Sequence, residues 1–179
     1  LEAQNLFVSY FQRVFQLHEK VVVMSPDIGG VKRAEQFRDK LAKGLSEEVG
    51  FAFMEKLRSK GIVSGEAVVG DVKDKHVIIL DDLISSGTTM ARAAAACAKV
   101  GSKGVFAVAT HGAFSHNASD ALGEQALLKV VVTNTILPGR LRETLSNKKL
   151  VVLDVAPLFA ETIRRLHSAG SLVSLMDIE

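Results

Sequence analysis

The sequence contains no Trp, one Tyr and one Cys among its 179 residues. With nine Phe as nearly all of its aromatic residues, a buried core must consist mainly of aliphatic side chains. The single Cys97 excludes an intrachain disulfide, and such low Cys usage is typical of a reducing compartment, so we expect a cytoplasmic protein. Cys97 lies in an Ala-rich segment and is expected to be a small core residue rather than a reactive thiol.

The sequence also lacks a strong charge imbalance and a long apolar run. The formal net charge is +2 and the Lys and Arg residues are scattered, so nothing indicates a nucleic-acid surface. No apolar run approaches the roughly 20 residues of a membrane span, and the amino end has no signal-peptide pattern. We therefore expect neither nucleic acid nor a membrane as a partner. A hydrophobic content of 47% is ordinary for a soluble globular domain.

What the sequence does have is a repeated alternation of short apolar runs with segments of helical periodicity. Strands are expected at residues 21–24, 50–55, 67–69, 77–80, 105–109, 130–132 and 150–153, with a further edge strand at 173–175. Helices are expected at 3–17, around 34–42, and at 91–99, 118–125 and 154–169, the last with Leu158, Phe159, Ile163 and Leu166 facing inward. This alternation favours an α/β fold of three layers, a mostly parallel, twisted sheet with helices on both faces. Residues 1–179 are expected to form one such domain.

The most informative stretch is 77–90, where four apolar residues run into two carboxylates and then into a hydroxyl-rich turn. This pattern predicts a buried parallel strand, a loop at its carboxyl end and a helix beyond the loop. The turn residues are Ser85, Ser86, Gly87, Thr88 and Thr89. Backbone N–H groups and the macrodipole at a helix N-terminus favour an anion, the hydroxyls add donors, and a Gly allows close approach or a positive φ. The turn is therefore a candidate phosphate site.

Asp81 and Asp82 precede this turn and add a second chemistry. Carboxylates repel a phosphate, but they suit the hydroxyls of a sugar attached to it, or a bridging Mg²⁺. The simpler alternative is a strand followed by a helix with a Ser or Thr cap. A cap needs only one such residue and gives the two carboxylates no role. The stretch therefore favours a phosphosugar site.

Two further segments follow expected strands and carry polar groups. In the segment 25–30, Gly29 and Gly30 offer backbone N–H groups to a second anion, and Asp27 is placed to coordinate a metal ion. The structural alternative for Asp27 is a helix cap. The segment 56–65 is basic and interrupted by Gly, as a mobile loop or an extended hairpin would be. On composition alone it is more simply a solvated loop.

In open α/β sheets, ligands bind beyond the carboxyl ends of the strands. The segments 25–30, 81–89 and 110–112, together with Lys56, all follow expected strands and should therefore meet at one edge of the sheet. His111 is the one His of the sequence expected at this edge. The convergence of the segments is stronger evidence for a site than any one of them.

The stretch 77–90 resembles the phosphoribosyl diphosphate (PRPP) binding motif of type I phosphoribosyltransferases and of the PRPP synthetases that share their fold. The whole chain resembles the carboxyl-terminal half of the PRPP synthetases, also called ribose-phosphate diphosphokinases. The pieces that carry this resemblance are 25–34, 65–72, 81–89, 109–112 and 132–136. Two departures concern affinity rather than the type of ligand. Ser85 stands where many members have Asp, and Thr88 replaces a Gly that is frequent in the family.

The resemblance implies transfer of a diphosphate from Mg-ATP to the anomeric hydroxyl of ribose 5-phosphate, in a homo-oligomeric enzyme. Residues 85–89 would hold the 5-phosphate, and Asp81 and Asp82 the ribose. The loop with Asp27, Gly29 and Gly30 would lie beside the diphosphate, with Asp27 on the Mg²⁺ cofactor. Lys56 and Arg58 would act on the transferring phosphates of the co-substrate ATP.

Members of this family are about twice as long, and their amino-terminal domain supplies much of the ATP site. The sequence begins with Leu1 rather than Met, as a fragment would, and we expect these 179 residues alone to be inactive. Two alternatives stay open. A free-standing phosphoribosyltransferase would fit the length, although no aromatic clamp for a base is visible. A non-catalytic subunit associated with a synthetase would not need Lys56 and Arg58.

Overall fold

A computed structural model of the chain describes residues 1–59, 62–115 and 117–175, and describes side chains for these residues except 56–59 and 62–66. Within this part of the chain, seven strands form one sheet in the order β3-β2-β1-β4-β5-β6-β7. The strands are β1 (Val21–Ser25), β2 (Val49–Ser59), β3 (Ile62–Val69), β4 (His76–Ile84), β5 (Gly104–Gly112), β6 (Leu127–Thr133) and β7 (Leu150–Leu153). β2 and β3 pair antiparallel and the other neighbours pair parallel, which confirms the mostly parallel sheet.

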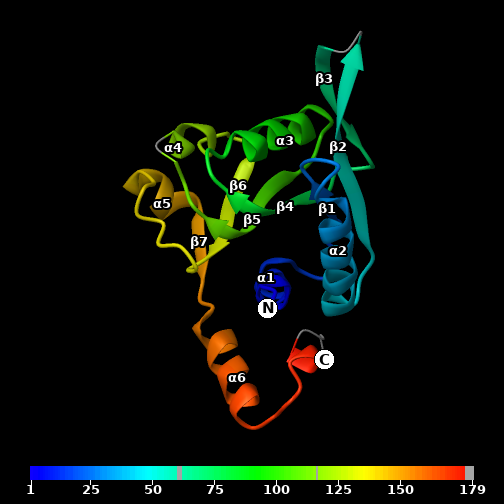
Figure 1. Cartoon of the computed structure of the whole chain (residues 1–179). Helices are drawn as coiled ribbons and strands as arrows, with labels where there is room; N and C mark the ends of the chain where they lie inside the picture. Colours follow the sequence, from blue (N-terminus) through cyan, green and yellow to red (C-terminus); the bar gives the residue numbers. More distant parts are fainter. Residues whose placement is uncertain (60–61, 116, 176–179) are drawn as a thin grey trace.

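Helices lie on both faces of the sheet and complete the three layers (Figure 1). They are α1 (Gln4–Val14), α2 (Val31–Leu45), α3 (Thr88–Lys99), α4 (Ala118–Ala121), α5 (Glu143–Lys149) and α6 (Ala156–His167), followed by a 3₁₀ turn at Val173–Leu175. α1 and α2 cover one face, and α3, α4 and α5 the other. Along β1, Val21 and Val23 join the core under α1 and α2, and Val22 and Met24 the core under α3. Burial on both faces explains why the strands are continuous apolar runs in the sequence.

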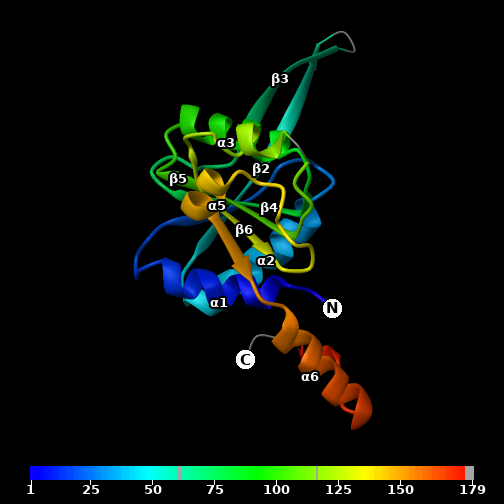
Figure 2. The same ribbon diagram turned by 90° about the vertical axis from the view of Figure 1, so that its left-hand side faces the viewer.

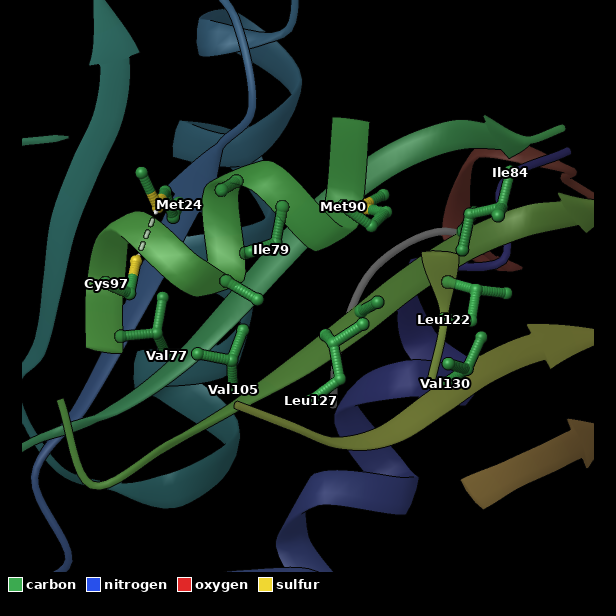
Figure 3. Packing of buried hydrophobic residues seen from close by; sticks show 14 of the residues in the cluster. Met24, Val77, Ile79, Ile84, Met90, Cys97, Val105, Leu122, Leu127 and Val130 are labelled. Carbon is green, nitrogen blue, oxygen red and sulfur yellow. Dashed lines mark hydrogen bonds between the residues drawn. The ribbon is translucent and has the colours of Figure 1, made fainter. Parts of the chain in front are cut away.

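The core under α3 is aliphatic and contains the single Cys. Figure 3 shows Met90 and Cys97 of α3 packed with Ile79 and Val105 of the sheet. The Sγ atom of Cys97 lies 3.3 Å from the Sδ atom of Met24. Burial raises the pKa of the Cys97 thiol to about 12, so the residue is an unreactive part of the core, as the sequence predicts.

The opposite core contains several of the Phe residues. Phe7 and Phe11 lie one helical turn apart on α1 and are almost fully buried. Phe11 packs edge to face against Phe106 of β5, with 5.5 Å between ring centroids, and Phe15 extends this contact beyond the helix. The packing fixes α1 across the sheet, and residues at its amino end line the candidate site.

β2 and β3 form a hairpin that leaves the body of the sheet. β1 pairs with β2 as far as Ser25 opposite Phe53, whereas β3 stays paired with β2 as far as Ser59. The backbone of residues 54–59 therefore extends past the carboxyl end of β1, and Figures 1 and 2 show the hairpin projecting from the domain. Of the two expected forms of 56–65, the described backbone has the extended hairpin.

Two strands continue further than the apolar runs that predict them. β4 reaches Ile84, so Asp81 and Asp82 lie within the strand rather than in a loop after it. β5 likewise reaches Gly112. The cause is the parallel pairing of the two strands, which continues through Asp81 opposite Ala109 to Ile84 opposite Gly112. Pairing satisfies the backbone there whatever the side chains are.

The carboxyl-terminal third departs most from the sequence prediction. α4 is shorter than the expected 118–125, and residues 173–175 form a 3₁₀ turn instead of an edge strand. α5 is not predicted from the sequence. It is polar and has no buried residue, so its sequence lacks the apolar periodicity that indicates a helix. No helix in the described part of the chain is both long and apolar enough to cross a membrane.

The inward-facing pattern predicted for the last helix is wrong. Phe159, Ile163 and Leu166 are 48%, 65% and 64% exposed, and only Leu158 of the four is half-buried. The reason is the direction of α6, which extends from the end of β7 away from the sheet instead of lying on it (Figures 1 and 2). The helix is amphipathic as predicted, but its apolar face does not meet this core.

Candidate functional site

The predicted segments do meet at one edge of the sheet. β1, β4 and β5 are adjacent parallel strands, so the residues that follow or end them lie side by side. A cleft of about 290 Å³ lies at this edge, and residues of α1, α2, β4 and β5 line it. The lining residues that bear on the chemistry are Arg33, Gln36, Asp81, Asp82, Thr110 and His111. The loop 27–30 and the turn 85–89 extend from the same strand ends.

The two carboxylates of β4 share one guanidinium. Arg33 Nη1 donates to Asp81 Oδ1 at 2.9 Å, and Arg33 Nη2 lies 3.2 Å from Asp82 Oδ2. The Asp82 backbone N–H also donates to Asp81 Oδ1, at 2.9 Å. These contacts hold both carboxylates in place and leave other oxygens of the pair for a ligand.

Arg33 is the site residue that sequence reasoning misses, although it lies in the matched segment 25–34. It occupies the first turn of α2, and α2 packs beside β4. A signal did exist in the sequence. A cation is disfavoured at a helix N-terminus by the macrodipole, so an Arg there, with no acidic residue in the first turn, indicates an acidic partner elsewhere.

The two carboxyl groups have different electrostatic surroundings. Asp81 is 24% exposed, and burial raises its pKa despite hydrogen bonds from the Asp82 backbone and from Arg33. Asp82 is 66% exposed. The slight burial of Asp82 raises its pKa. The Arg33 charge and neighbouring hydrogen bonds outweigh this effect, so that the pKa of Asp82 is lowered overall. As the pH falls, Asp81 therefore takes up a proton before Asp82 does.

At pH 7, Asp81→Asn is expected to leave the melting temperature unchanged or to raise it by at most about 2–4 °C. For a domain of this size, that shift corresponds to a change of about 1 kcal/mol in the free energy of unfolding. A raised folded-state pKa means that ionising Asp81 lowers the free energy of unfolding as the pH rises through that pKa. Below the ordinary value of 3.8 the difference from the parent should vanish. Thermal melts from pH 3 to 8 measure it. Asp82→Asn is the control and should show the opposite, smaller trend, and matching trends would contradict the assignment.

The hydroxyl-rich turn leads directly into α3. Gly87 is the residue before the helix and has a φ of 74°, in the left-handed region. Ser86 Oγ accepts the Thr88 backbone N–H at 3.3 Å and bonds to Thr88 Oγ1 at 3.0 Å. Ser85 and Thr89 are also exposed, and Gly87 alone is buried. The first backbone N–H groups of a helix have no partner within it, so this turn presents both backbone and hydroxyl donors to solvent.

The turn is anchored from the strand side. The carbonyl oxygen of Ile84 accepts backbone N–H groups from Ala113 and Phe114, and the Ser85 carbonyl oxygen accepts one from Ser115. These bonds tie the start of the turn to the chain that leaves β5. The donors of the turn are thus held in a preformed arrangement.

The loop after β1 is closed by its own acidic residue. Asp27 Oδ1 accepts the Gly30 backbone N–H at 3.0 Å, and Ser25 Oγ donates to the Asp27 carbonyl oxygen at 2.6 Å. A Cβ at Gly30 would lie 2.6 Å from Ser25 Oγ, so the tight loop requires Gly there. Gly29 is exposed at the tip. Asp27 therefore has a structural role close to the expected cap, and one of its carboxylate oxygens remains for a ligand.

Across the described residues, no group of three or more His, Cys, Asp or Glu side chains is arranged to hold a metal ion. Mg²⁺ commonly takes one or two carboxylates and completes its shell with water and substrate phosphates. The exposed Asp27 carboxylate fits that kind of binding, in which the ion accompanies a phosphorylated substrate.

His111 stands at the end of β5 on the same edge. Its Nδ1 atom lies 2.9 Å from Thr135 Oγ1, in a contact whose donor depends on the tautomer. Thr133 Oγ1 donates to the Thr110 carbonyl oxygen at 2.7 Å and bonds to Thr135. This network fixes the imidazole beside the cleft.

Lys56 and Arg58 lie on β2 in the projecting part of the hairpin, with a register shift between residues 57 and 58. Their side chains are outside the described part of the structure. The backbone places both residues beyond the carboxyl end of β1, on the side of the sheet where the site lies. Whether they reach a ligand remains a prediction.

The fold and this edge define a phosphoribosyltransferase-type α/β domain, in which paired carboxylates precede a hydroxyl-rich turn at a helix N-terminus. Comparison with known proteins identifies the family. Residues 54–177 match the model of the phosphoribosyl synthetase-associated domain, and the chain belongs to that family. The resemblance to PRPP synthetases is thereby confirmed.

The chain is similar to several ribose-phosphate pyrophosphokinases. One from Clostridium acetobutylicum is 39% identical over 169 residues, which are 93% of this chain and 50% of the relative. Another from Wolinella succinogenes is 42% identical over 155 residues, 86% of this chain and 47% of the relative. The crystal structure of phosphoribosylpyrophosphate synthetase from Mycobacterium smegmatis matches with a TM-score of 0.75 and 37% identity, covering 94% of this chain and 51% of that one. The chain spans about half the length of the relatives it matches.

Proposed function

We propose that this chain is the carboxyl-terminal, ribose 5-phosphate-binding domain of a two-domain ribose-phosphate pyrophosphokinase. The observation that carries the proposal is the proximity of two chemistries at the end of β4. Two anchored carboxylates, Asp81 and Asp82, are followed within one turn by exposed hydroxyls at the N-terminus of α3. A phosphorylated sugar needs acceptors for its hydroxyls and donors for its phosphate, in that proximity.

In this proposal the 5-phosphate lies against residues 85–89, where the backbone N–H groups and the macrodipole of α3 favour a dianion. The ribose hydroxyls donate to Asp82 and Asp81. Arg33 offsets much of the negative charge of the pair, which reduces the repulsion between the carboxylates and the bound phosphate.

The reaction we propose is transfer of a diphosphate from ATP to the 1-hydroxyl of ribose 5-phosphate, giving PRPP and AMP. Lys56 and Arg58 supply positive charge to the transferring group, which carries negative charge on several oxygens in the transition state. Asp27 would hold Mg²⁺ together with the substrate phosphates, and the ion supplies charge neutralisation there. The loop with Gly29 and Gly30 lies beside the diphosphate. The complete enzyme is proposed to be cytoplasmic and homo-oligomeric, in line with its family.

Titration of this chain with ribose 5-phosphate, with and without Mg²⁺, tests the binding proposal by calorimetry. The parent chain should bind, and Asp82→Ala and Thr89→Ala should each abolish the heat signal or weaken affinity at least about tenfold, or 1.4 kcal/mol. Thr144→Ala is a matched control, because Thr144 is exposed and is the second residue of α5 as Thr89 is of α3. Equal binding by the parent, both variants and the control would show that Asp82 and Thr89 do not bind ribose 5-phosphate.

An AMP-release assay separates this proposal from a free-standing phosphoribosyltransferase. The 179-residue chain should show only background release from ATP, because much of the ATP site of the family lies in the other half. The complete chain should turn over. Consumption of PRPP with a free base by the 179-residue chain would favour the transferase instead.

A further inference from the structure

His111 lies beside the segment that joins the two carboxylates of β4 to the hydroxyl-rich turn. In the parallel pairing of β4 with β5, His111 is opposite Leu83. Leu83 comes directly after Asp82 and two residues before Ser85, and neighbouring strands are about 4.8 Å apart. The imidazole also lines the same cleft as both carboxylates. A ligand that reaches from the carboxylates to the turn therefore passes close to His111.

One nitrogen of the ring contacts a small network of threonine oxygens. His111 Nδ1 lies 2.9 Å from Thr135 Oγ1. Thr135 Oγ1 also lies 3.0 Å from Thr133 Oγ1 and 3.2 Å from the Thr110 carbonyl oxygen. Thr133 Oγ1 donates to the same carbonyl oxygen at 2.7 Å. Thr135 Oγ1 thus has three close contacts, but its hydroxyl has a single hydrogen.

The hydrogens available in this network determine the tautomer of the neutral ring. The carbonyl oxygen has no hydrogen to give, and the Thr133 hydrogen is used in the bond to it. If the Thr135 hydroxyl donated to Nδ1, its two contacts with oxygen would hold acceptor against acceptor with no hydrogen between them. If it donates to those oxygens instead, Nδ1 carries the hydrogen that bonds to Thr135 Oγ1, and every contact is satisfied. Nε2 is then an acceptor.

The cleft therefore offers two kinds of acceptor to a sugar. Asp81 and Asp82 are carboxylates, held together by Arg33. Nε2 of His111 is uncharged and has no hydrogen-bond partner among the residues that the structure describes. The ring is exposed, so a ligand in the cleft can reach this nitrogen.

Ribose 5-phosphate has hydroxyls on carbons 1, 2 and 3, and the two kinds of acceptor suit different ones. Two adjacent carboxylates match two neighbouring hydroxyls. In the proposed reaction the 1-hydroxyl oxygen receives a diphosphate, and a carboxylate beside that oxygen would repel the incoming group. The carboxylates therefore suit the 2- and 3-hydroxyls, and the uncharged Nε2 suits the 1-hydroxyl.

We propose that Nε2 of His111 accepts a hydrogen bond from the 1-hydroxyl of ribose 5-phosphate and takes its proton during diphosphate transfer. This inference rests on the proposed function. The 1-oxygen forms a bond to the β-phosphorus of ATP, and the bond from that phosphorus to the oxygen bridging to the α-phosphorus breaks, with its electron pair leaving on AMP. The hydroxyl proton moves to Nε2, and the ring later releases it to solvent. Thr135 holds the ring in the tautomer that this step requires.

Calorimetry on the 179-residue chain tests the contact with the 1-hydroxyl. Ribose 5-phosphate is compared with 1,4-anhydroribitol 5-phosphate, which lacks that hydroxyl, and the parent should bind ribose 5-phosphate about tenfold more tightly. His111→Asn should bind both equally, because Asn keeps a donor toward Thr135 but has no atom at the position of Nε2. His111→Gln should restore part of the difference, because its amide oxygen reaches that position.

Two controls accompany this comparison. His18→Asn should keep the parental difference, because His18 is exposed at the amino end of β1, the opposite edge of the sheet, and has a positive φ that Asn tolerates. The preference for ribose 5-phosphate over 2-deoxyribose 5-phosphate should be the same in the parent and in His111→Asn. Loss of that preference in His111→Asn would place Nε2 at the 2-hydroxyl and overturn the proposal.

Turnover by the complete synthetase tests the proton transfer. His111→Asn and His111→Gln should each lower kcat at least about 100-fold, because Gln restores the hydrogen bond but cannot take a proton. Thr135→Val should also lower kcat, with both neutral tautomers visible in nitrogen NMR of the ring, and Thr135→Ser should restore both readouts. Near-parental kcat in His111→Gln would overturn the proposal. Failure of the parent chain to bind ribose 5-phosphate would refute the proposed function and this inference with it, whereas parental binding without the predicted difference would refute this inference alone.

Discussion

Lys56→Ala and Arg58→Ala, each made in the complete synthetase, are expected to lower kcat at least about 100-fold. Both residues lie on the hairpin that extends past the carboxyl end of β1. A cation brought to the transferring phosphates acts where charge develops, so it stabilises the transition state more than the bound substrate. Removing one such donor typically costs on the order of 10²–10³ in kcat, about 2.7–4 kcal/mol.

The pattern of kinetic effects distinguishes catalysis from binding. Ribose 5-phosphate affinity should change less than about tenfold in either variant, or 1.4 kcal/mol, because the proposed sugar site lies on β4 and α3. Arg58→Lys should recover only part of the lost kcat, since an ammonium does not reproduce the planar fork of a guanidinium on phosphate oxygens. Lys103→Ala, exposed just before β5 at the opposite edge of the sheet, is the control. Near-normal kcat in both Ala variants would show that the hairpin is only a solvated surface element. The synthetase mechanism could then not be assigned to this chain.

Local signals in the sequence are enough to predict the sheet and its edge. Four consecutive apolar residues at 77–80 predict β4 because a central parallel strand is buried on both faces. Hydroxyl residues around Gly87 predict the turn before α3. Parallel pairing of these strands then brings their carboxyl ends together, so the position of the site follows from the predicted strands alone.

What the sequence could not predict depends on contacts between distant residues. Arg33 reaches Asp81 across 48 positions, and its place in the first turn of α2 indicates an acidic partner without identifying which residue that is. The strand continues through Asp82 because β5 pairs with it, although two carboxylates would locally favour a loop. The spacing of Phe159, Ile163 and Leu166 correctly predicts an amphipathic helix. Periodicity identifies an apolar face but not the body that covers it, and here this domain does not cover it.

Gly87→Ala is expected to weaken ribose 5-phosphate binding to the isolated chain at least about tenfold, or 1.4 kcal/mol. Gly87 has a φ of 74°, which costs an L residue roughly 1–2 kcal/mol. The added Cβ would also lie 2.7 Å from Leu122 Cγ, and relieving such overpacking costs typically about 1–3 kcal/mol. The turn can relieve both by shifting, and a shift would move the first N–H groups of α3 away from the position that we propose for the phosphate.

Gly101→Ala separates backbone strain from the loss of the site. Gly101 has a similar φ of 87°, but its Cβ would meet only Lys73 Cγ at 3.5 Å, an ordinary contact. It follows the end of α3, at the other end of the helix from the turn 85–89. Gly101→Ala should therefore lower the free energy of unfolding by roughly 1–2 kcal/mol and leave ribose 5-phosphate affinity at the parental value.

Leu122→Ala identifies which part of the Gly87→Ala effect comes from the contact with Leu122. Alone it should lower the free energy of unfolding by about 2–5 kcal/mol, because Leu122 is fully buried. Combined with Gly87→Ala it removes the atoms that the new Cβ would overlap, so the second substitution should cost less than in the parent. A coupling energy of about 0.5–3 kcal/mol in denaturant titrations, with partial return of ribose 5-phosphate binding, is the expected result. Additive free energies and no recovery would mean that the effect of Gly87→Ala comes from the left-handed backbone at Gly87 rather than from overlap of the new Cβ with Leu122.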